Sequence, residues 1–571
     1  MVVSKEQELV NDVRDTIRNK VGWVPECCIP AEQDNMGEKE PPGEAGPPAP
    51  RRRLLLMQVL LGVVANMGGI SAGANLGFSA VALPQMRHPN ATLSVSADEA
   101  SWIAGVAALA TPVGCLLSGW LLDRLGRRAA LLWQNVPALL GWLLIALPLD
   151  ETLGRDHGLG AVYVGRILTG LATGMGSVPG TVYVAEVGLK ELRGMLVTWT
   201  SIAISLGIVL VYVIGAVLPS WRLVAAVCGA FPLLTLVLVY AVVVESPVWL
   251  LGRGRVSEAR AALARTRLAR SPADVDDELA ALVRERPPPP QRAADAAPAA
   301  SGPRGLLRDL RRPECWKPLL IMNVFFLFQQ LSGVFVVIFY AVDMVVEAGV
   351  DANPYYVTVM IGLARLLVTI VTGFLSNKVG RRPLAIISGA GMTVCMMALA
   401  THLLLQSGGL AGSGLLPGPW LPAAALVTFI LASTLGFLTL PWAMIGEVFP
   451  ARFRGVAGGF TTCSAYLYSF AVVKAHPGAS HALERHGVFF FYGAMALLGT
   501  LFVALALPET QGRSLSDIGE CFKGRGCGGR RRQLRQDAGE DEAAARLQPQ
   551  TDKIAAELKS INGNDVIPSK I

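Results

Sequence analysis

The chain carries one set of charged signatures twice, and each copy follows an apolar segment. The sequence Asp-Arg-Leu-Gly-Arg-Arg at 123–128 is echoed 254 residues later by Asn-Lys-Val-Gly-Arg-Arg at 377–382. A Glu-Val pair at 186–187 and the acidic Glu245 recur at 447–448 and at Glu509, after 261 and 264 residues. Soluble repeat proteins have periods of about 20–50 residues. A repeat of half a hydrophobic chain therefore predicts a duplicated bundle of membrane helices.

The composition agrees with a membrane bundle. Of the 571 residues, 52% are hydrophobic and 16% are charged, whereas soluble domains carry about 25% charged residues. A bilayer span needs about 20 apolar residues, and the chain offers twelve such runs. We place them at 54–83, 101–122, 129–149, 160–184, 195–217, 221–244, 316–341, 354–376, 383–405, 419–446, 456–475 and 487–507.

The positive charges of the short loops predict the orientation. Arg and Lys residues cluster after spans 2, 8 and 10, whereas the loops after spans 1, 3 and 9 carry few or none. The loop after span 11, with Lys474 and Arg485, is the exception. Both termini and the long middle loop are thus expected in the cytoplasm. The sequon Asn90-Ala91-Thr92 falls in an outward loop, so Asn90 is a candidate glycosylation site.

These features predict five segments along the chain. They are a disordered cytoplasmic tail at 1–53, a six-helix half at 54–244, a cytoplasmic linker with short helices at 245–315, a second six-helix half at 316–507 and a cytoplasmic tail at 508–571. The first fifty residues are polar and contain no signal peptide. The nine Cys residues lack metal-ligand spacing, so we expect no metal and no cofactor. The net charge of +7 fits contact with anionic lipid rather than nucleic acid.

Eight short motifs stand in order at the ends of these spans. They are DRLGRR at 123–128, GRILTG at 165–170, YVAEV at 183–187, ESP at 245–247, QQLSG at 329–333, PW at 441–442, GEVFP at 446–450 and LPETQGRSL at 507–515. In these motifs the chain resembles the sugar porter family of the major facilitator superfamily, which includes facilitative glucose carriers and insect trehalose carriers. The resemblance covers about 54–520. It implies an all-α fold of twelve transmembrane helices in two halves, and a carrier rather than an enzyme.

The resemblance also implies a role for the repeated charges. In this family they form salt-bridge networks that latch the cytoplasmic side in the outward-open state, and such ion pairs can break when water enters. The alternative is a purely structural role, in which these charges only anchor the ends of the spans. The candidate latch residues are Arg127, Arg128, Glu186, Arg193 and Glu245 in the first half, and Arg381, Arg382, Glu447, Arg454 and Glu509 in the second.

A sugar site needs hydrogen-bonding groups and an aromatic face, which the resemblance places on spans 5, 7, 8, 10 and 11. Gln329, Gln330 and Trp442 match the family's pattern. Adjacent glutamines on a helix point about 100° apart, so one of them is the better ligand contact. Other positions depart from the pattern and keep only some polar capacity. They are Ser201, Arg365 and Tyr466.

Two arginines within the spans are candidates for special roles. Arg166 is expected to have a structural role in the cytoplasmic network, with substrate contact as the alternative. Arg365 either lines the substrate path or pairs inside the second half. In the family, proton-coupled members carry a carboxylate in span 1. This span has none, with Gly77 near the expected place, which favours passive uniport.

The sequence therefore predicts a plasma-membrane uniporter, monomeric by default, for a sugar such as a hexose or trehalose, working by alternating access. Because several polar positions of the cavity differ from the family's pattern, two alternative functions stay open. One is a carrier of another small polar or anionic solute, and the other is a sensor that binds solute without transporting it.

Overall fold

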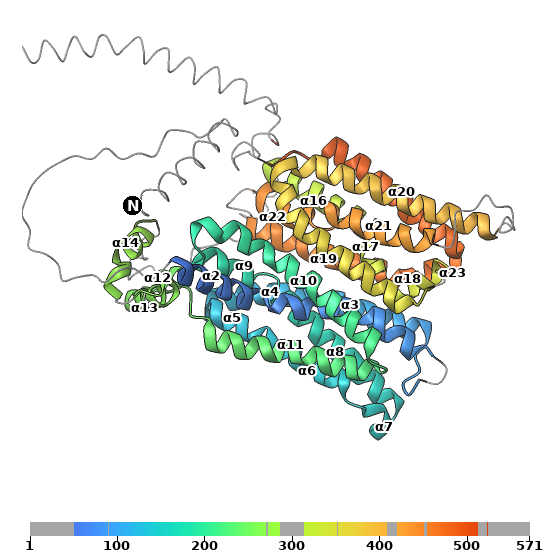
Figure 1. The fold of residues 1–571 in the computed structure, drawn as a ribbon, viewed down its shortest axis with the longest axis horizontal. Helices are drawn as coiled ribbons and strands as arrows, with labels where there is room; N and C mark the ends of the chain where they lie inside the picture. Colours follow the sequence, from blue (N-terminus) through green and yellow to red (C-terminus); the bar gives the residue numbers. More distant parts are fainter. Residues whose placement is uncertain are drawn as a thin grey trace, which may run out of the picture. The chain divides into compact units, whose positions relative to one another are not determined.

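The computed structural model describes residues 51–88, 91–269, 272–285, 313–350, 352–407, 420–449, 454–511 and 522. All its regular elements within these ranges are helices (Figure 1). Most of the predicted tails, the second part of the linker and Asn90 lie outside the described residues.

The first half contains six spans, three of which are broken into two helices. The broken spans are α2–α3 (Arg51–Asn66 and Gly68–Met86), α5–α6 (Arg127–Trp133 and Asn135–Ala146) and α8–α9 (Arg155–Met175 and Pro179–Val187). The continuous spans are α4 (Ala97–Leu125), α10 (Lys190–Val217) and α11 (Trp221–Val242). A short helix, α7 (Leu149–Leu153), precedes α8.

The second half repeats this plan in its first and fourth spans, which are broken, but its third span is continuous. One broken span comprises α16 (Pro313–Leu331), α17 (Val334–Phe339) and α18 (Ala341–Glu347), and another comprises α21 (Leu421–Leu435) and α22 (Leu440–Val448). The helices α19 (Pro354–Val379) and α20 (Arg381–Ser407) are continuous. The long α23 (Arg454–Ala506) bends at Glu484, whose φ of 57° interrupts the helical backbone, so it supplies spans 11 and 12.

The prediction of an all-α fold with twelve spans in two halves is confirmed. Nine helical segments of the described residues are long and apolar enough to cross a membrane, and the bent α23 is one of them. Counting α23 as two spans and adding α8–α9 and α16–α18 gives twelve. Large apolar side chains such as Leu116 and Leu505 are exposed, as expected of surfaces that face lipid rather than water.

Small residues bring the helices of the first half close together. A Cβ atom on Gly73 of α3 would lie 2.0 Å from the carbonyl oxygen of Ile204 on α10, and one on Gly207 of α10 would lie 2.1 Å from that of Ile70. Helices in lipid associate largely through such close packing. The two glycines thus hold α3 and α10 in contact.

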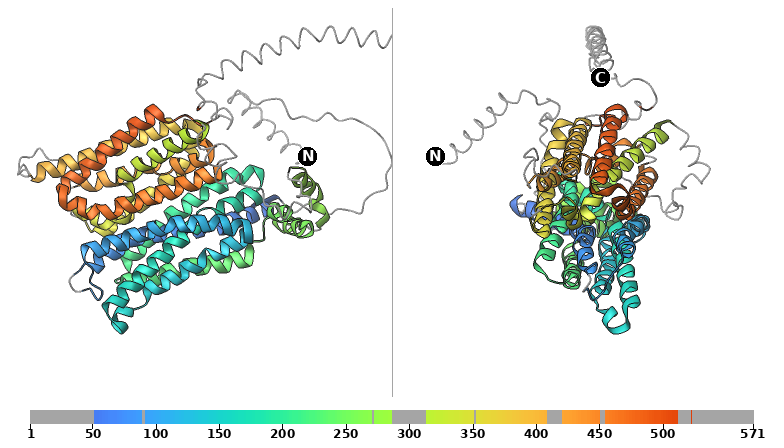
Figure 2. Two further views of the ribbon diagram at one scale, coloured as in Figure 1. Left: turned by 180° about the vertical axis from the view of Figure 1, so that it is seen from behind. Right: turned by 90° about the vertical axis from the view of Figure 1, so that its right-hand side faces the viewer.

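Three short helices follow the first half and pack against one end of it (Figure 2). They are α12 (Pro247–Gly252), α13 (Val256–Arg267) and α14 (Asp276–Glu285). The buried Gln58 of α2 joins them to the bundle, because its Nε2 donates to the carbonyl of Thr266 at 3.0 Å and its Oε1 accepts from the amide of Leu189 at 3.3 Å. We call this the linker end of the molecule and the other the far end.

Candidate functional site

The first charged cluster lies at the linker end, between α5 and α9. The guanidinium of Arg127 donates to both carboxylate oxygens of Glu186, at 2.8 and 2.7 Å. The two side chains are only 13% and 14% exposed, so this bidentate pair is partly withdrawn from water and stronger than a surface pair. The hydroxyl of Ser246 donates a further hydrogen bond to Glu186 at 2.5 Å.

Glu245 completes the cluster by accepting from the backbone at the start of α5. Its carboxylate receives the amides of Arg127 at 2.8 Å, Arg128 at 3.2 Å and Ser246 at 2.9 Å. A carboxylate is stabilised at a helix N-terminus, where the amides are otherwise unpaired. Gly126 permits this approach: its φ is +99°, and a Cβ there would lie 2.5 Å from a Glu245 oxygen.

The second half repeats this cluster. Arg381 donates to Glu447 at 2.8 and 3.4 Å, and the hydroxyl of Thr510 donates to the same carboxylate at 2.7 Å. Glu509 accepts the amides of Arg381 and Arg382, each at 3.0 Å. Even the second arginine of each copy matches, because Arg128 and Arg382 both donate to a backbone carbonyl, of Tyr240 and Ala504. The sequence repeat is therefore also a repeat in three dimensions.

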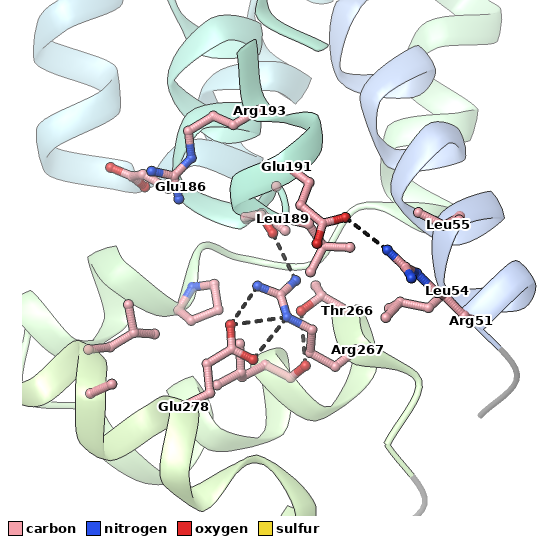
Figure 3. Close-up of a pocket in the computed structure, with 16 residues that line it drawn as sticks. Arg51, Leu54, Leu55, Glu186, Leu189, Glu191, Arg193, Thr266, Arg267 and Glu278 are labelled. Atoms are coloured by element: carbon pink, nitrogen blue, oxygen red, sulfur yellow. Dashed lines mark hydrogen bonds and ion pairs between the residues drawn. The ribbon is translucent and has the colours of Figure 1, made fainter. Parts of the chain in front are cut away.

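The two remaining latch candidates are not part of these clusters. Arg193 lines a cavity of about 610 Å³ between the first half and the linker helices, beside Glu186 (Figure 3). It forms no ion pair with any described residue, whereas its neighbours in the cavity pair as Arg51–Glu191 and Arg267–Glu278. The side chain of Arg454 lies outside the described residues.

The ion pairs at the linker end each join residues of one half or its linker, as far as the structure describes them. At the far end, ion pairs connect the halves. Arg87 pairs with Asp343, and Lys474 pairs with Asp98 while lying 4.7 Å from the ring centre of Trp102. Sequence reasoning missed these groups, although Lys474 stood out as an exception in the loop charges. The halves are thus bound to each other at the far end.

Gln329 and Gln330 play different parts. Pro441 has no amide to donate to the carbonyl four residues earlier, that of Phe437. The buried side chain of Gln329 supplies the missing donor, at 2.6 Å from Phe437 O and 3.1 Å from Leu438 O. The amide of Gln330 makes one long contact to Gln329, at 3.4 Å, and its Oε1 is buried without a partner among the described residues. Gln330 is therefore the glutamine with capacity left for a ligand.

Three aromatic rings from different helices gather around Trp442, on the second half. Trp442 of α22 is half-buried, and its ring centre lies 4.9 Å from that of Phe326 on α16 and 5.5 Å from that of Tyr466 on α23. Phe326 precedes Gln330 by four residues, which is about one helical turn. The structure thus brings Trp442 and Tyr466 of the predicted site together, with Gln330 one helical turn from their neighbour Phe326. Gln329 contacts the carbonyls of Phe437 and Leu438 instead.

Ser201 and Arg365 lie at another place, where α10 of the first half packs on α19 of the second. Ser205 and Thr369 connect these helices through a hydrogen bond of 3.0 Å between their hydroxyls. Ser201 is exposed one turn from Ser205 toward the linker end. Arg365 lies one turn from Thr369 toward the far end, so the two candidates are about 12 Å apart along the bundle.

The prediction that Arg166 belongs to the cytoplasmic network is wrong, although its role is structural as predicted. This fully buried side chain does not join the charged cluster of the linker end but binds neutral groups of α3 and α4. It donates to Asn75 Oδ1 at 2.6 Å, Ser79 Oγ at 2.9 Å and the carbonyl of Ile103 at 3.2 Å. The sequence could not show this, because helical position alone does not tell which acceptors surround a buried cation.

Comparison with known proteins gives the same family throughout. Residues 61–522 match the family described as "Sugar (and other) transporter". The facilitated trehalose transporter Tret1 of Culex quinquefasciatus is 32% identical over 477 residues, which cover 83% of this chain and 88% of that protein. Tret1 of Aedes aegypti is 31% identical, with 87% of this chain covered, but the chain spans only 59% of its length.

Solved structures have the same fold. The inward-open xylose transporter XylE from E. coli superposes with a TM-score of 0.64 at 22% identity, over 81% of this chain and 99% of that one. The proton:xylose symporter XylE bound to 6-bromo-6-deoxy-D-glucose gives a TM-score of 0.62, also at 22% identity, over 82% and 99%.

Proposed function

Because this chain belongs to the sugar porter family of the major facilitator superfamily, whose members are carriers and not enzymes, we propose that it transports a sugar by facilitated diffusion. The candidate cargoes are a hexose and the disaccharide trehalose. The mosquito relatives are named as trehalose transporters. The duplicated charged clusters, set on a twelve-helix bundle, are the observation that carries this proposal.

The surroundings of Arg166 support uniport. A proton-coupled carrier needs a group that gains and loses a proton during the cycle. The side chain that meets the buried Arg166 most closely in the first span is Asn75, at 2.6 Å, and an amide does not titrate. A Cβ on Gly77 would lie 2.6 Å from Val211 and 3.0 Å from Tyr212, so the position named by the sequence has no room for a carboxylate.

The charged clusters support alternating access. The halves are tied at the far end by Arg87–Asp343 and Lys474–Asp98, whereas the linker-end ion pairs of the described residues stay within each half or its linker. We infer that the opposite state breaks the far-end pairs and brings the clusters together. Arg193, which is exposed beside Glu186, is then free to take a carboxylate of the second half. We propose that the ten latch candidates close the linker end in this opposite state.

The solute site is proposed at the second half's aromatic group. Trp442 and Tyr466 offer ring faces for the apolar side of a sugar, and Gln330 offers an unpartnered oxygen to one of its hydroxyls. Ser201 and Arg365 are proposed to extend the path on the α10–α19 side. Gln329 is proposed to stabilise the break between α21 and α22, where it donates to two backbone carbonyls, rather than to bind the ligand.

We further propose that the carrier is a monomer in the plasma membrane, with the linker end, both tails and the loop of α12–α14 in the cytoplasm. The clustering of Arg residues at this end supports that orientation. Asn90 then lies on the outer side and is available for glycosylation.

Uptake into cells that lack their own hexose carriers tests this function. Labelled glucose and trehalose are supplied with and without a proton gradient, and Trp442→Ala is the matched variant. We expect saturable uptake that is independent of the gradient and is reduced in Trp442→Ala. Uptake that follows the gradient would contradict uniport. Absence of uptake of both sugars, with the protein detected at the surface, would point to another solute or to a sensor.

A further inference from the structure

Among the described residues, two arginines within the spans are fully or nearly buried, and their surroundings differ sharply. Arg166 is 0% exposed, and its three guanidinium nitrogens all donate, to Ile103 O, to Asn75 and to Ser79. Its side chain also lies against Phe78, 5.8 Å from the ring centre. This arginine shows how the fold satisfies a buried cation when the cation has a purely structural role.

Arg365 is 8% exposed and lacks every one of these contacts. Its Nε and Nη1 are buried and have no hydrogen-bond partner among the described residues, and the side chain forms no ion pair with them. Leaving a charged donor unpaired in a low-dielectric interior is costly, and charges inside membrane spans usually serve function. The side chain therefore has binding capacity that the protein itself does not use.

The position of Arg365 places this capacity between the two halves. On α19, a Cβ at Gly362 would lie 3.0 Å from the ring of Tyr212 on α10, and Thr369 bonds Ser205 on α10. Arg365 is three and four residues from these contacts, so it lies on the same face of α19. Tyr212 in turn donates its hydroxyl to the carbonyl of Ile338 on α17 at 2.8 Å. The guanidinium thus sits where α10, α17 and α19 meet.

No carboxylate of these helices is available to neutralise it. The helices α17 and α19 contain no Asp or Glu, and the only acidic residue of α10 is Glu191 in its first turn. Glu191 lies about 21 Å from the level of Ser205 and about 32 Å from that of Tyr212 by helical rise, and it pairs with Arg51. A ligand that brings its own negative charge fits this place better than a neutral one.

We propose that Arg365 binds the carboxylate of the transported solute, and that the preferred cargo is an acidic sugar, a hexuronate or an aldonate. The proposal rests on the proposed function as a sugar carrier and names the class of sugar. A planar guanidinium offers two parallel N–H donors to a carboxylate. A neutral sugar supplies acceptors for these donors but leaves the charge uncompensated.

The test uses the full-length protein in liposomes. Uptake of labelled glucuronate and glucose is measured in the wild type, in Arg365→Gln and in Arg365→Lys, with the membrane potential set by a potassium gradient and valinomycin. In the wild type we expect a kcat/KM for glucuronate at least about tenfold above that for glucose, as a charge-assisted hydrogen bond supplies. An inside-negative potential should slow glucuronate uptake and leave glucose uptake unchanged, because only glucuronate carries charge.

The variants separate a binding role from a structural one. Arg365→Gln should lose glucuronate uptake about 10- to 100-fold and lose much less of its glucose uptake, so that the ratio of the two rates falls, and Arg365→Lys should restore part of the loss without bidentate binding. A wild type that transports glucose but not glucuronate would overturn the acidic-sugar proposal and leave the sugar carrier standing. Transport of neither sugar by protein that is confirmed in the vesicles would overturn both. The wild-type comparison decides the question even if a variant does not fold.

Discussion

Replacing Gln329 with leucine is expected to destabilise the second half far more than the same change at Gln330. Gln329 donates two hydrogen bonds, at 2.6 and 3.1 Å, to carbonyls freed by the break before Pro441. A buried hydrogen bond contributes about 1 kcal/mol net, and a buried carbonyl left unsatisfied costs about 1–3 kcal/mol. Gln329→Leu should therefore lower the free energy of unfolding by about 2–4 kcal/mol.

Gln330→Leu is the matched control, because the two residues are adjacent, chemically identical and both buried. It removes a single contact of 3.4 Å and an oxygen that has no partner among the described residues, so we expect a loss below about 1 kcal/mol. If Gln330 binds the solute, its loss should raise KM about 3- to 10-fold, the equivalent of one hydrogen bond.

Thermal unfolding in detergent micelles can measure the difference. A thiol-reactive dye reports unfolding by labelling buried cysteines, of which Cys228, Cys315 and Cys395 are examples. At about 2–4 °C per kcal/mol for a unit of this size, Gln329→Leu should melt at least about 2 °C below Gln330→Leu. Equal melting temperatures, or a larger loss in Gln330→Leu, would refute the assignment of Gln329 as the brace of the broken span.

Three further outcomes follow from the same geometry. Lys474→Ala removes an ion pair and a cation–π contact at the far end, which together contribute about 1 kcal/mol. Cysteines introduced near Asp98 should therefore react with a membrane-impermeant thiol reagent about fivefold faster in this variant. An unchanged rate would show that the Lys474 contacts do not hold the far end closed. Glu245→Gln and Glu509→Gln each remove a charge that accepts several helix-start amides. Both should lower the free energy of unfolding by similar amounts, about 1–3 kcal/mol each, and so lower the melting temperature. A loss in only one would mean that the repeated clusters are not equivalent. Asn75→Asp places a titratable group against Arg166 and should make uptake depend on pH, whereas pH-dependent uptake already in the wild type would count against uniport.

Much of the fold was predictable because it follows from the bilayer. A lipid environment requires about 20 apolar residues per span and forbids unpaired backbone groups, so the apolar runs predicted twelve helices without knowledge of their packing. The duplication was equally visible, since the motifs around Arg127 and Arg381 keep their order.

The sequence by itself determined the class of protein, the number of spans and the eight charged residues of the two clusters, because hydropathy and repeated motifs are local properties of the chain. Only the tertiary structure decided what each polar side chain meets. In the structure, Gln329 donates to a carbonyl of the broken span, and Arg166 donates to Asn75 rather than to the charged clusters of the linker end. Two guanidinium nitrogens of Arg365 have no acceptor among the described residues. The reason is physical: a buried donor is satisfied by whichever acceptor packing brings within about 3 Å, and residues distant in sequence supply that acceptor.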